Sequence, residues 1–131
     1  MATELQVEIV TPEASTYSGT ASEVLVRAWE GDLGILPDHD ALLTLLRAGT
    51  CVLTGPAGNH RLVLGRGFAE IGGSRITILT DTCIPVGEVD KAKAKADLAA
   101  AEEILASADV HSERHRQAEI AAEHAQARLD A

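Results

Sequence analysis

Aromatic side chains are scarce in this chain of 131 residues, which contains Tyr17, Trp29 and Phe68 and no others. Proteins that bind single-stranded nucleic acid stack its bases on aromatic faces, so the composition disfavours that class. Lysine and arginine together number 11 against 20 aspartates and glutamates, which gives a net charge of -9. Because duplex-binding proteins neutralise phosphates with basic side chains, the sequence predicts no nucleic-acid partner.

Long apolar runs are also missing, and none approaches the roughly 18 residues that a membrane-spanning helix needs. Met1 to Glu4 lack the basic start of a signal peptide, so we expect neither a leader nor a membrane span. The two cysteines, Cys51 and Cys83, are too few and too far apart for a disulfide scaffold. Both lie in β-like apolar segments, which predicts small buried side chains in a reducing compartment.

Glycine and proline are confined to the first two thirds of the sequence. All 11 glycines lie at or before Gly87, and all 4 prolines at or before Pro85. Both residue types form turns and interrupt helices, whereas alanine, which is concentrated after Gly87, favours helix. The distribution predicts two domains, a turn-rich one at 1–86 and a helical one at 87–131.

The first domain has the pattern of short antiparallel strands. Leu5, Val7 and Ile9 alternate with polar residues, and turn residues at 55–58 and 72–73 separate β-branched segments as in hairpins. The segment 30–39 is predicted to be a loop. The expected fold is an N-terminal antiparallel β-sandwich, with strands at 5–10, 15–18, 23–28, 50–54, 60–64, 68–71 and 75–80.

The second domain is predicted to be an antiparallel hairpin of two helices, at 88–107 and 110–129, with Asp109 as the N-cap of the second. Apolar residues recur at helical spacing. They are Ala94, Leu98, Ala101, Leu105 and Ala108 in the first helix, and Ala118, Ala121, Ala122, Ala125 and Leu129 in the second. Alanine buries little area, so the hairpin is expected to be the less stable part and able to detach. A permanently docked hairpin is the alternative.

Sequence patterns for metal or phosphate binding are incomplete. Gly65–Gly67 begins like a dinucleotide-binding turn, but Glu70 stands where the third glycine is needed. His111 and His115 have the i, i+4 spacing of two metal ligands, yet the sequence offers no third ligand. We therefore predict no metal site.

Asp38, His39 and Asp40 form a polar cluster that could act as a general base with an orienting carboxylate. No nucleophile motif accompanies the cluster. The sequence predicts no catalytic residue, and an enzyme built around 38–40 is the weakest of the alternatives.

The segment Glu30–Leu43 resembles the signature of the epsilon subunit of bacterial F-type ATP synthase: Glu-Gly, an acidic residue, Leu-Gly, then proline and histidine at fixed spacing. Further similarities follow in order along the chain. Ser18–Gly19, Leu64–Phe68 and Ile76–Thr82 resemble strand segments of that family, although Arg66 occupies a position where many members have glycine or serine. The resemblance covers essentially the whole chain.

This resemblance implies a non-catalytic rotor subunit of the central stalk, which couples proton flow through the membrane c-ring to ATP synthesis. The sandwich would dock on the gamma subunit and the c-ring. The helical hairpin would fold on the sandwich or extend into the alpha and beta subunits, where it inhibits ATP hydrolysis. The chain would be peripheral, at the cytoplasmic face of the bacterial plasma membrane. A stand-alone β-sandwich binding module with an oligomerising helical hairpin is the alternative.

The resemblance also implies particular contacts. The c-ring would face Glu30, Gly31, Asp32, Leu33 and His39. No cofactor is required, but some bacterial members bind regulatory ATP through a hydrophobic residue, aspartate, two variable positions, arginine and alanine. The matching segment, 89–94, has lysine in place of arginine, and lysine offers a mobile point charge where arginine offers a planar fork. The candidate ATP-binding residues are Glu88, Asp90, Lys93, Arg114, Arg116 and Arg128.

Overall fold

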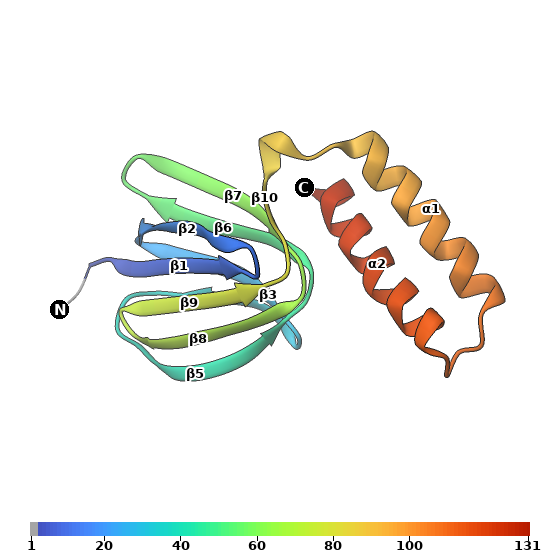
Figure 1. Cartoon of the computed structure of the whole chain (residues 1–131). Coiled ribbons are helices and arrows are strands. Elements are labelled where there is room, and N and C mark those ends of the chain that lie inside the picture. Colours follow the sequence, from blue (N-terminus) through green and yellow to red (C-terminus); the bar gives the residue numbers. More distant parts are fainter. Residues whose placement is uncertain (1–2) are drawn as a thin grey trace.

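The computed structural model describes residues 3–131, so Met1 and Ala2 of the predicted 1–86 domain lie outside the described residues. Figure 1 shows a β-sandwich with a pair of helices packed against one end, α2 lying nearer to the strands than α1. Within the described residues the strands are β1 Leu5–Thr11, β2 Ala14–Ala21, β3 Glu23–Ala28, β4 Gly31–Ile35, β5 His39–Leu46, β6 Gly49–Gly55, β7 Gly58–Leu64, β8 Gly67–Gly73, β9 Arg75–Thr80 and β10 Cys83–Pro85.

The strands form one continuous sheet that folds over on itself. Its order is β10-β7-β6-β3-β5-β8-β9-β1-β2, with β4 paired to β3. The junction between β3 and β5 is the single described pair Ala28–Leu46, where the sheet passes from one layer of the sandwich to the other. The described pairings are antiparallel except β1 with β9, which is parallel. The predicted β-sandwich followed by two helices is confirmed.

Alternating apolar side chains fill the space between the layers. Leu5, Val7 and Ile9 of β1 are at most 2% exposed, as predicted from their spacing. They pack with buried residues of the other strands, including Val24, Val26, Leu53, Ile71, Ile76 and Ile78. Burying each large side chain stabilises the fold by about 1.5–3 kcal/mol, so this core holds the sandwich together.

The two cysteines differ in their surroundings. Cys51 is fully buried in the core, as predicted, and burial followed by the nearby Cys83 raises the pKa of its thiol to about 12. Cys83 is only half-buried at the edge of the sheet, so its predicted burial is partly wrong. Both thiols are free. A raised pKa keeps Cys51 protonated and unreactive at neutral pH.

The prediction for 30–39 is wrong because this segment contains a strand. β4 pairs with β3 from Val24–Ile35 to Ala28–Gly31, and a turn at residues 36–38 leads directly into β5. The strand β5 was not predicted because its leucines stand in adjacent positions, so the sequence lacks the alternation of apolar and polar residues that indicates a strand. The short strand β10 was also missed.

Two helices follow the sandwich, α1 Lys91–Ser107 and α2 Glu113–Asp130. The predicted start of α1 at residue 88 is three residues too early, because Val86–Glu88 forms a separate 3-10 turn, η1. Asp90 is the N-cap of α1, and its side chain accepts a hydrogen bond from the Lys93 backbone N–H at 3.0 Å. The capping satisfies one of the free amides of the first turn.

The start of α2 also differs from the prediction. Asp109 accepts a hydrogen bond from the His111 N–H at 2.8 Å, which makes a turn between the helices rather than a helix cap. Ser112 is the N-cap, and its hydroxyl accepts from the His115 N–H at 3.1 Å. The helix therefore starts at Glu113, three residues later than predicted, because Ser112 and not Asp109 provides the capping side chain.

Small side chains pack the two helices together. Ala94 and Ala101 of α1 and Ala118 and Ala125 of α2 are at most 4% exposed, as the predicted stripes require. Ala121 is exposed. The other stripe residues are half-buried, namely Leu98, Leu105, Ala108, Ala122 and Leu129. In the described part of the chain, no helix is long and apolar enough to cross a membrane.

Candidate functional site

An exposed row of apolar side chains crosses the outer face of β5, β8, β9 and β1. The sheet register pairs Leu45 with Phe68, Phe68 with Leu79 and Leu79 with Val10. Leu45 is 60% exposed, Phe68 41% and Leu79 38%. Val10 is half-buried at the end of this row. Directly opposed residues share one face of a sheet, so Val10, Leu45, Phe68 and Leu79, which we call the apolar row, form a continuous strip. A contiguous apolar surface of this kind is typical of a protein–protein interface.

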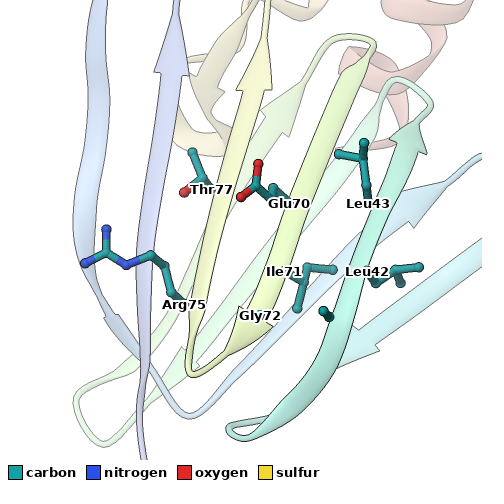
Figure 2. Close-up of a pocket in the computed structure, with 8 residues that line it drawn as sticks. Leu42, Leu43, Glu70, Ile71, Gly72, Arg75 and Thr77 are labelled. Atoms are coloured by element: carbon teal, nitrogen blue, oxygen red, sulfur yellow. The ribbon is translucent and has the colours of Figure 1, made fainter.

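Farther from the helices, the same face carries charged and polar side chains beside an exposed leucine. Figure 2 shows Leu43, Glu70 and Thr77 side by side on β5, β8 and β9, with Arg75 further along β9. These residues line a shallow cavity of about 490 Å³. A second cavity of about 330 Å³ lies beside Phe68 and Leu79 of the apolar row. The face therefore combines an apolar strip with a flank of mixed polarity, a composition compatible with an interface.

The predicted c-ring residues are divided between the two ends of β4. Glu30, Gly31 and Asp32 are exposed at the turn from β3 to β4, where Gly31 has a φ of 139° that favours glycine. His39 is the first residue of β5 and lies beyond the other end of β4. The strand β4 is about 13 Å long at the usual rise per residue. Leu33 is half-buried against the core. The structure thus brings three of these residues together, with Leu33 turned inward and His39 apart.

The Asp38–Asp40 cluster is built into a tight turn. Asp38 has a φ of 63°, its N–H donates to Ser74 Oγ at 3.2 Å, and its carboxylate accepts from the same hydroxyl at 3.3 Å. His39 Nδ1 lies 2.7 Å from the backbone oxygen of Asp40. A backbone oxygen, and not a neighbouring carboxylate, therefore contacts the imidazole. These contacts join the turn before β5 to the turn between β8 and β9.

The hairpin meets the sandwich through a small apolar cluster and one acidic side chain. Ala48, Val63 and Ala127 are buried together where α2 meets β7 and the connection before β6. The carboxylate of Glu123 forms an ion pair with Arg66, Nε to Oε2 at 2.7 Å, and lies 3.6 Å from Arg47 Nη1. Two of the three buried residues of this cluster are alanines, which bury little area, so the charged contact contributes a large share of what holds the hairpin in place.

The surroundings of Glu123 act on its pKa in opposite directions. Burial raises the pKa of the carboxyl, but hydrogen bonds from Arg66 and from the Ala48 N–H, together with the charges of Arg66 and Arg47, lower it below its ordinary value. A lowered pKa means that docking is stabilised above the ordinary carboxyl range and weakens as the pH falls through the docked pKa. The contact is therefore complete at neutral pH.

His124, the next residue of α2, lies in the same interface. Burial, then the charge of Arg128, lowers the pKa of the imidazole below its usual value. Among the described residues its Nε2 is buried and has no hydrogen-bond partner. His124 is therefore a neutral side chain at neutral pH.

Three of the predicted ATP-binding residues lie near one another at the base of the hairpin. Asp90 caps α1, and Lys93 and Arg128 both bind the carboxylate of Asp97, at 3.1 Å and 2.9 Å. The Asp97 carboxyl has a lowered pKa because of hydrogen bonds from Arg128 and Lys93. Glu88, in η1, is close in sequence to Asp90.

Arg114 and Arg116 lie at the opposite end of the hairpin. They belong to the first turn of α2, about 18–21 Å along the helix from Arg128 at 1.5 Å per residue. Arg116 forms an ion pair with Glu113 at 2.8 Å. The structure therefore does not bring these two arginines to the base of the hairpin.

Sequence reasoning missed Glu123, Arg47 and the apolar row. Glu123 and Arg66 are 57 positions apart, and no local periodicity reports such a pair. The apolar row includes Leu45, which lies in the strand that the sequence did not reveal. The one available signal was Arg66 itself, an arginine in a segment that otherwise resembles a glycine-rich family pattern. Among residues 3–131, no group of three or more His, Cys, Asp or Glu side chains is arranged to hold a metal ion.

A family model described as ATP synthase, Delta/Epsilon chain, beta-sandwich domain matches residues 4–86. The ATP synthase epsilon chain of Maricaulis maris is 32% identical over 124 residues, covering 95% of this chain and 93% of the relative. ATP synthase epsilon chain 2 of Ralstonia nicotianae is 42% identical over 102 residues, covering 77% of this chain and 73% of the relative.

Solved structures share the fold. A chain in the cryo-EM structure of Euglena gracilis mitochondrial ATP synthase, OSCP/F1/c-ring in rotational state 1, has a TM-score of 0.84 and 22% identity, covering 96% of this chain and 79% of that chain. The family model spans the strands of the sandwich, and the Maricaulis maris relative extends the match over both helices. The chain belongs to the ATP synthase delta/epsilon family, as an epsilon chain.

Proposed function

We propose that this chain is a non-catalytic rotor subunit of the central stalk in an F-type proton-transporting ATP synthase, and that it couples proton flow through the c-ring to ATP synthesis. The observation that carries the proposal is the apolar row, an exposed strip on a protein whose relatives are named ATP synthase epsilon chains. The gamma subunit is the partner that this strip would contact. The turn at Glu30–Asp32 and the separate turn at His39 are the surfaces proposed for the c-ring.

The helical hairpin is proposed to regulate the complex. In the described conformation the hairpin lies on the sandwich, where its interface is small and rich in alanine. A shift of a few kcal/mol between alternative contacts would move it toward the alpha and beta subunits, where it would inhibit ATP hydrolysis. The proposed location is the cytoplasmic face of the bacterial plasma membrane, as a peripheral part of the complex.

The substitution Phe68→Glu tests the proposed docking surface. A carboxylate in the middle of the apolar row would be desolvated against gamma, and we expect the gamma subunit recovered with the tagged chain to fall about 10-fold or more. Leu25→Glu is the matched control, because Leu25 is 37% exposed on a strand of the other layer. Equal recovery of gamma by the two variants, both folded by circular dichroism, would contradict the assignment of this face.

Regulatory ATP binding at the base of the hairpin is a second proposal, favoured by the closeness of Asp90, Lys93 and Arg128. A phosphate group would replace Asp97 as the partner of the two cations. We expect isothermal titration of the isolated chain to detect binding at millimolar ATP, and Lys93→Arg to bind about 5-fold more tightly through its planar fork. An absence of heat for both proteins at millimolar ATP would reject the site.

A further inference from the structure

We propose that Arg66, Arg47 and the backbone N–H of Ala48 form a receptor for a carboxylate, and that Glu123 fills this receptor to hold the helical hairpin on the sandwich. The receptor belongs to the sandwich, whereas Glu123 belongs to α2. The inference deepens the proposed function and rests on it for its regulatory meaning, since it names the contact that controls the position of the hairpin.

The guanidinium of Arg66 binds the carboxylate with two parallel hydrogen bonds. Nε donates to Oε2 of Glu123 at 2.7 Å, and Nη2 donates to Oε1 at 3.2 Å. This fork geometry is the strong form of an arginine–carboxylate pair, since it matches two donors to two acceptors. The Glu123 side chain is only 16% exposed, so water screens the pair less than it screens a surface ion pair.

Two further donors complete the receptor from a different connection. The Ala48 N–H donates to Oε2 of Glu123 at 3.1 Å, and Arg47 Nη1 lies 3.6 Å from Oε1. Arg47 and Ala48 join β5 to β6, whereas Arg66 lies between β7 and β8. One side chain of α2 therefore ties together two connections at the end of the sandwich.

Trp29 holds the two arginines in position. Arg47 Cζ lies 4.1 Å and Arg66 Cζ 5.3 Å from the centroid of the indole ring, and Arg47 Nε donates to the Trp29 carbonyl oxygen at 3.1 Å. Stacking of this kind restricts the guanidinium groups before an anion arrives. Two cations fixed beside one ring repel each other unless an anion lies between them, so the receptor favours a carboxylate.

The remaining contacts of the hairpin do not replace this one. Among the described contacts, the hydrogen bonds and ion pairs that join α1 or α2 to the strands and their connections all end on Glu123. The Lys91 amine, by contrast, binds carbonyl oxygens at the end of α2 and stays within the hairpin. The apolar cluster of Ala48, Val63 and Ala127 remains when the Glu123 charge is removed, so this change should raise the fraction of molecules with an open hairpin without unfolding either part.

Hydrogen exchange of the Ala48 amide in the isolated full-length chain tests the receptor. Ala48 is 1% exposed and its N–H donates to Glu123, so its exchange requires the hairpin to leave. We expect Glu123→Gln and Arg66→Gln each to accelerate this exchange about 10-fold or more. Emission from Trp29, the sole tryptophan of the sequence, should shift in the same two variants.

The control is Glu102→Gln, which removes the same charge from an exposed position of α1. We expect its Ala48 exchange to stay within about 2-fold of the unmodified chain. In the double variant Arg66→Gln with Glu123→Gln, Ala48 should exchange no more than about 2-fold faster than in either single variant. The reason is that the two substitutions remove the same contact, the ion pair between Arg66 and Glu123. Exchange in Glu123→Gln equal to that in Glu102→Gln, or effects that multiply in the double variant, would overturn the receptor.

The measurement separates this inference from the proposed function. It uses the isolated chain, with no other ATP synthase subunit present. Unchanged Ala48 exchange would overturn the receptor while leaving attachment to gamma intact. Loss of attachment to gamma would overturn the proposed function while leaving the receptor intact.

Discussion

A chain that ends at Gly87 is expected to assemble into the ATP synthase complex and to raise its ATP hydrolysis at least about 5-fold relative to the full-length chain, since allosteric coupling energies are typically 1–3 kcal/mol. The core of the sandwich consists of residues before this point, so its fold does not depend on the helices. The truncation removes the helices that would extend toward the alpha and beta subunits. Steady-state hydrolysis by the purified complex, with coupling followed by proton pumping, measures the effect.

The matched control for the truncation is the full-length chain added back to the same depleted complex. Both chains are added to a complex from which the original chain has been removed. The two samples therefore differ in the presence of the helices alone. Hydrolysis rates that are the same with both chains, at equal incorporation, would show that the hairpin has no inhibitory role in this complex.

Gly67→Ala is expected to lower the free energy of unfolding by about 1–3 kcal/mol, the range typical of overpacking in a core. A Cβ at Gly67 would overlap the backbone carbonyl oxygen of Leu79 and crowd the Cα of Thr80. These are backbone atoms of the paired strand β9, so they cannot move aside without disturbing the β8–β9 register. Urea denaturation followed by circular dichroism measures the change.

Gly72→Ala is the matched control, because Gly72 lies on the same strand and a Cβ there meets no heavy atom within 4 Å. We expect its free energy of unfolding to change by less than about 1 kcal/mol. If the two variants unfold at the same urea concentration, the close approach of β8 and β9 at Gly67 does not limit stability.

The elements with regular periodicity could be predicted from the sequence. The alternation of Leu5, Val7 and Ile9 marked a strand with one buried face, and the absence of glycine and proline after Gly87 marked the helices. Caps were less predictable, because Asp109 and Ser112 are both good N-cap residues and only the turn geometry selects between them. Segment 30–39 looked like a loop because its glycines obscure the strand β4.

The functional surfaces depended on contacts that no local pattern records. Leu45, Phe68 and Leu79 become one strip only through strand pairing, and exposed leucines broke the alternation that would have revealed β5. Arg66 and Glu123 meet because the hairpin folds back on the sandwich. The resemblance to a family indicated the general role, whereas the residues that hold the hairpin required the structure.

Co-purification tests the proposed rotor role most directly. The tagged full-length chain is purified with its partners from membranes of a bacterium that expresses it at natural levels. We expect gamma and the c subunits to be recovered with the chain in mild detergent, in the proportions of an assembled rotor. Recovery of the chain alone, or of its own oligomers without gamma, would contradict a rotor role and favour a stand-alone binding module.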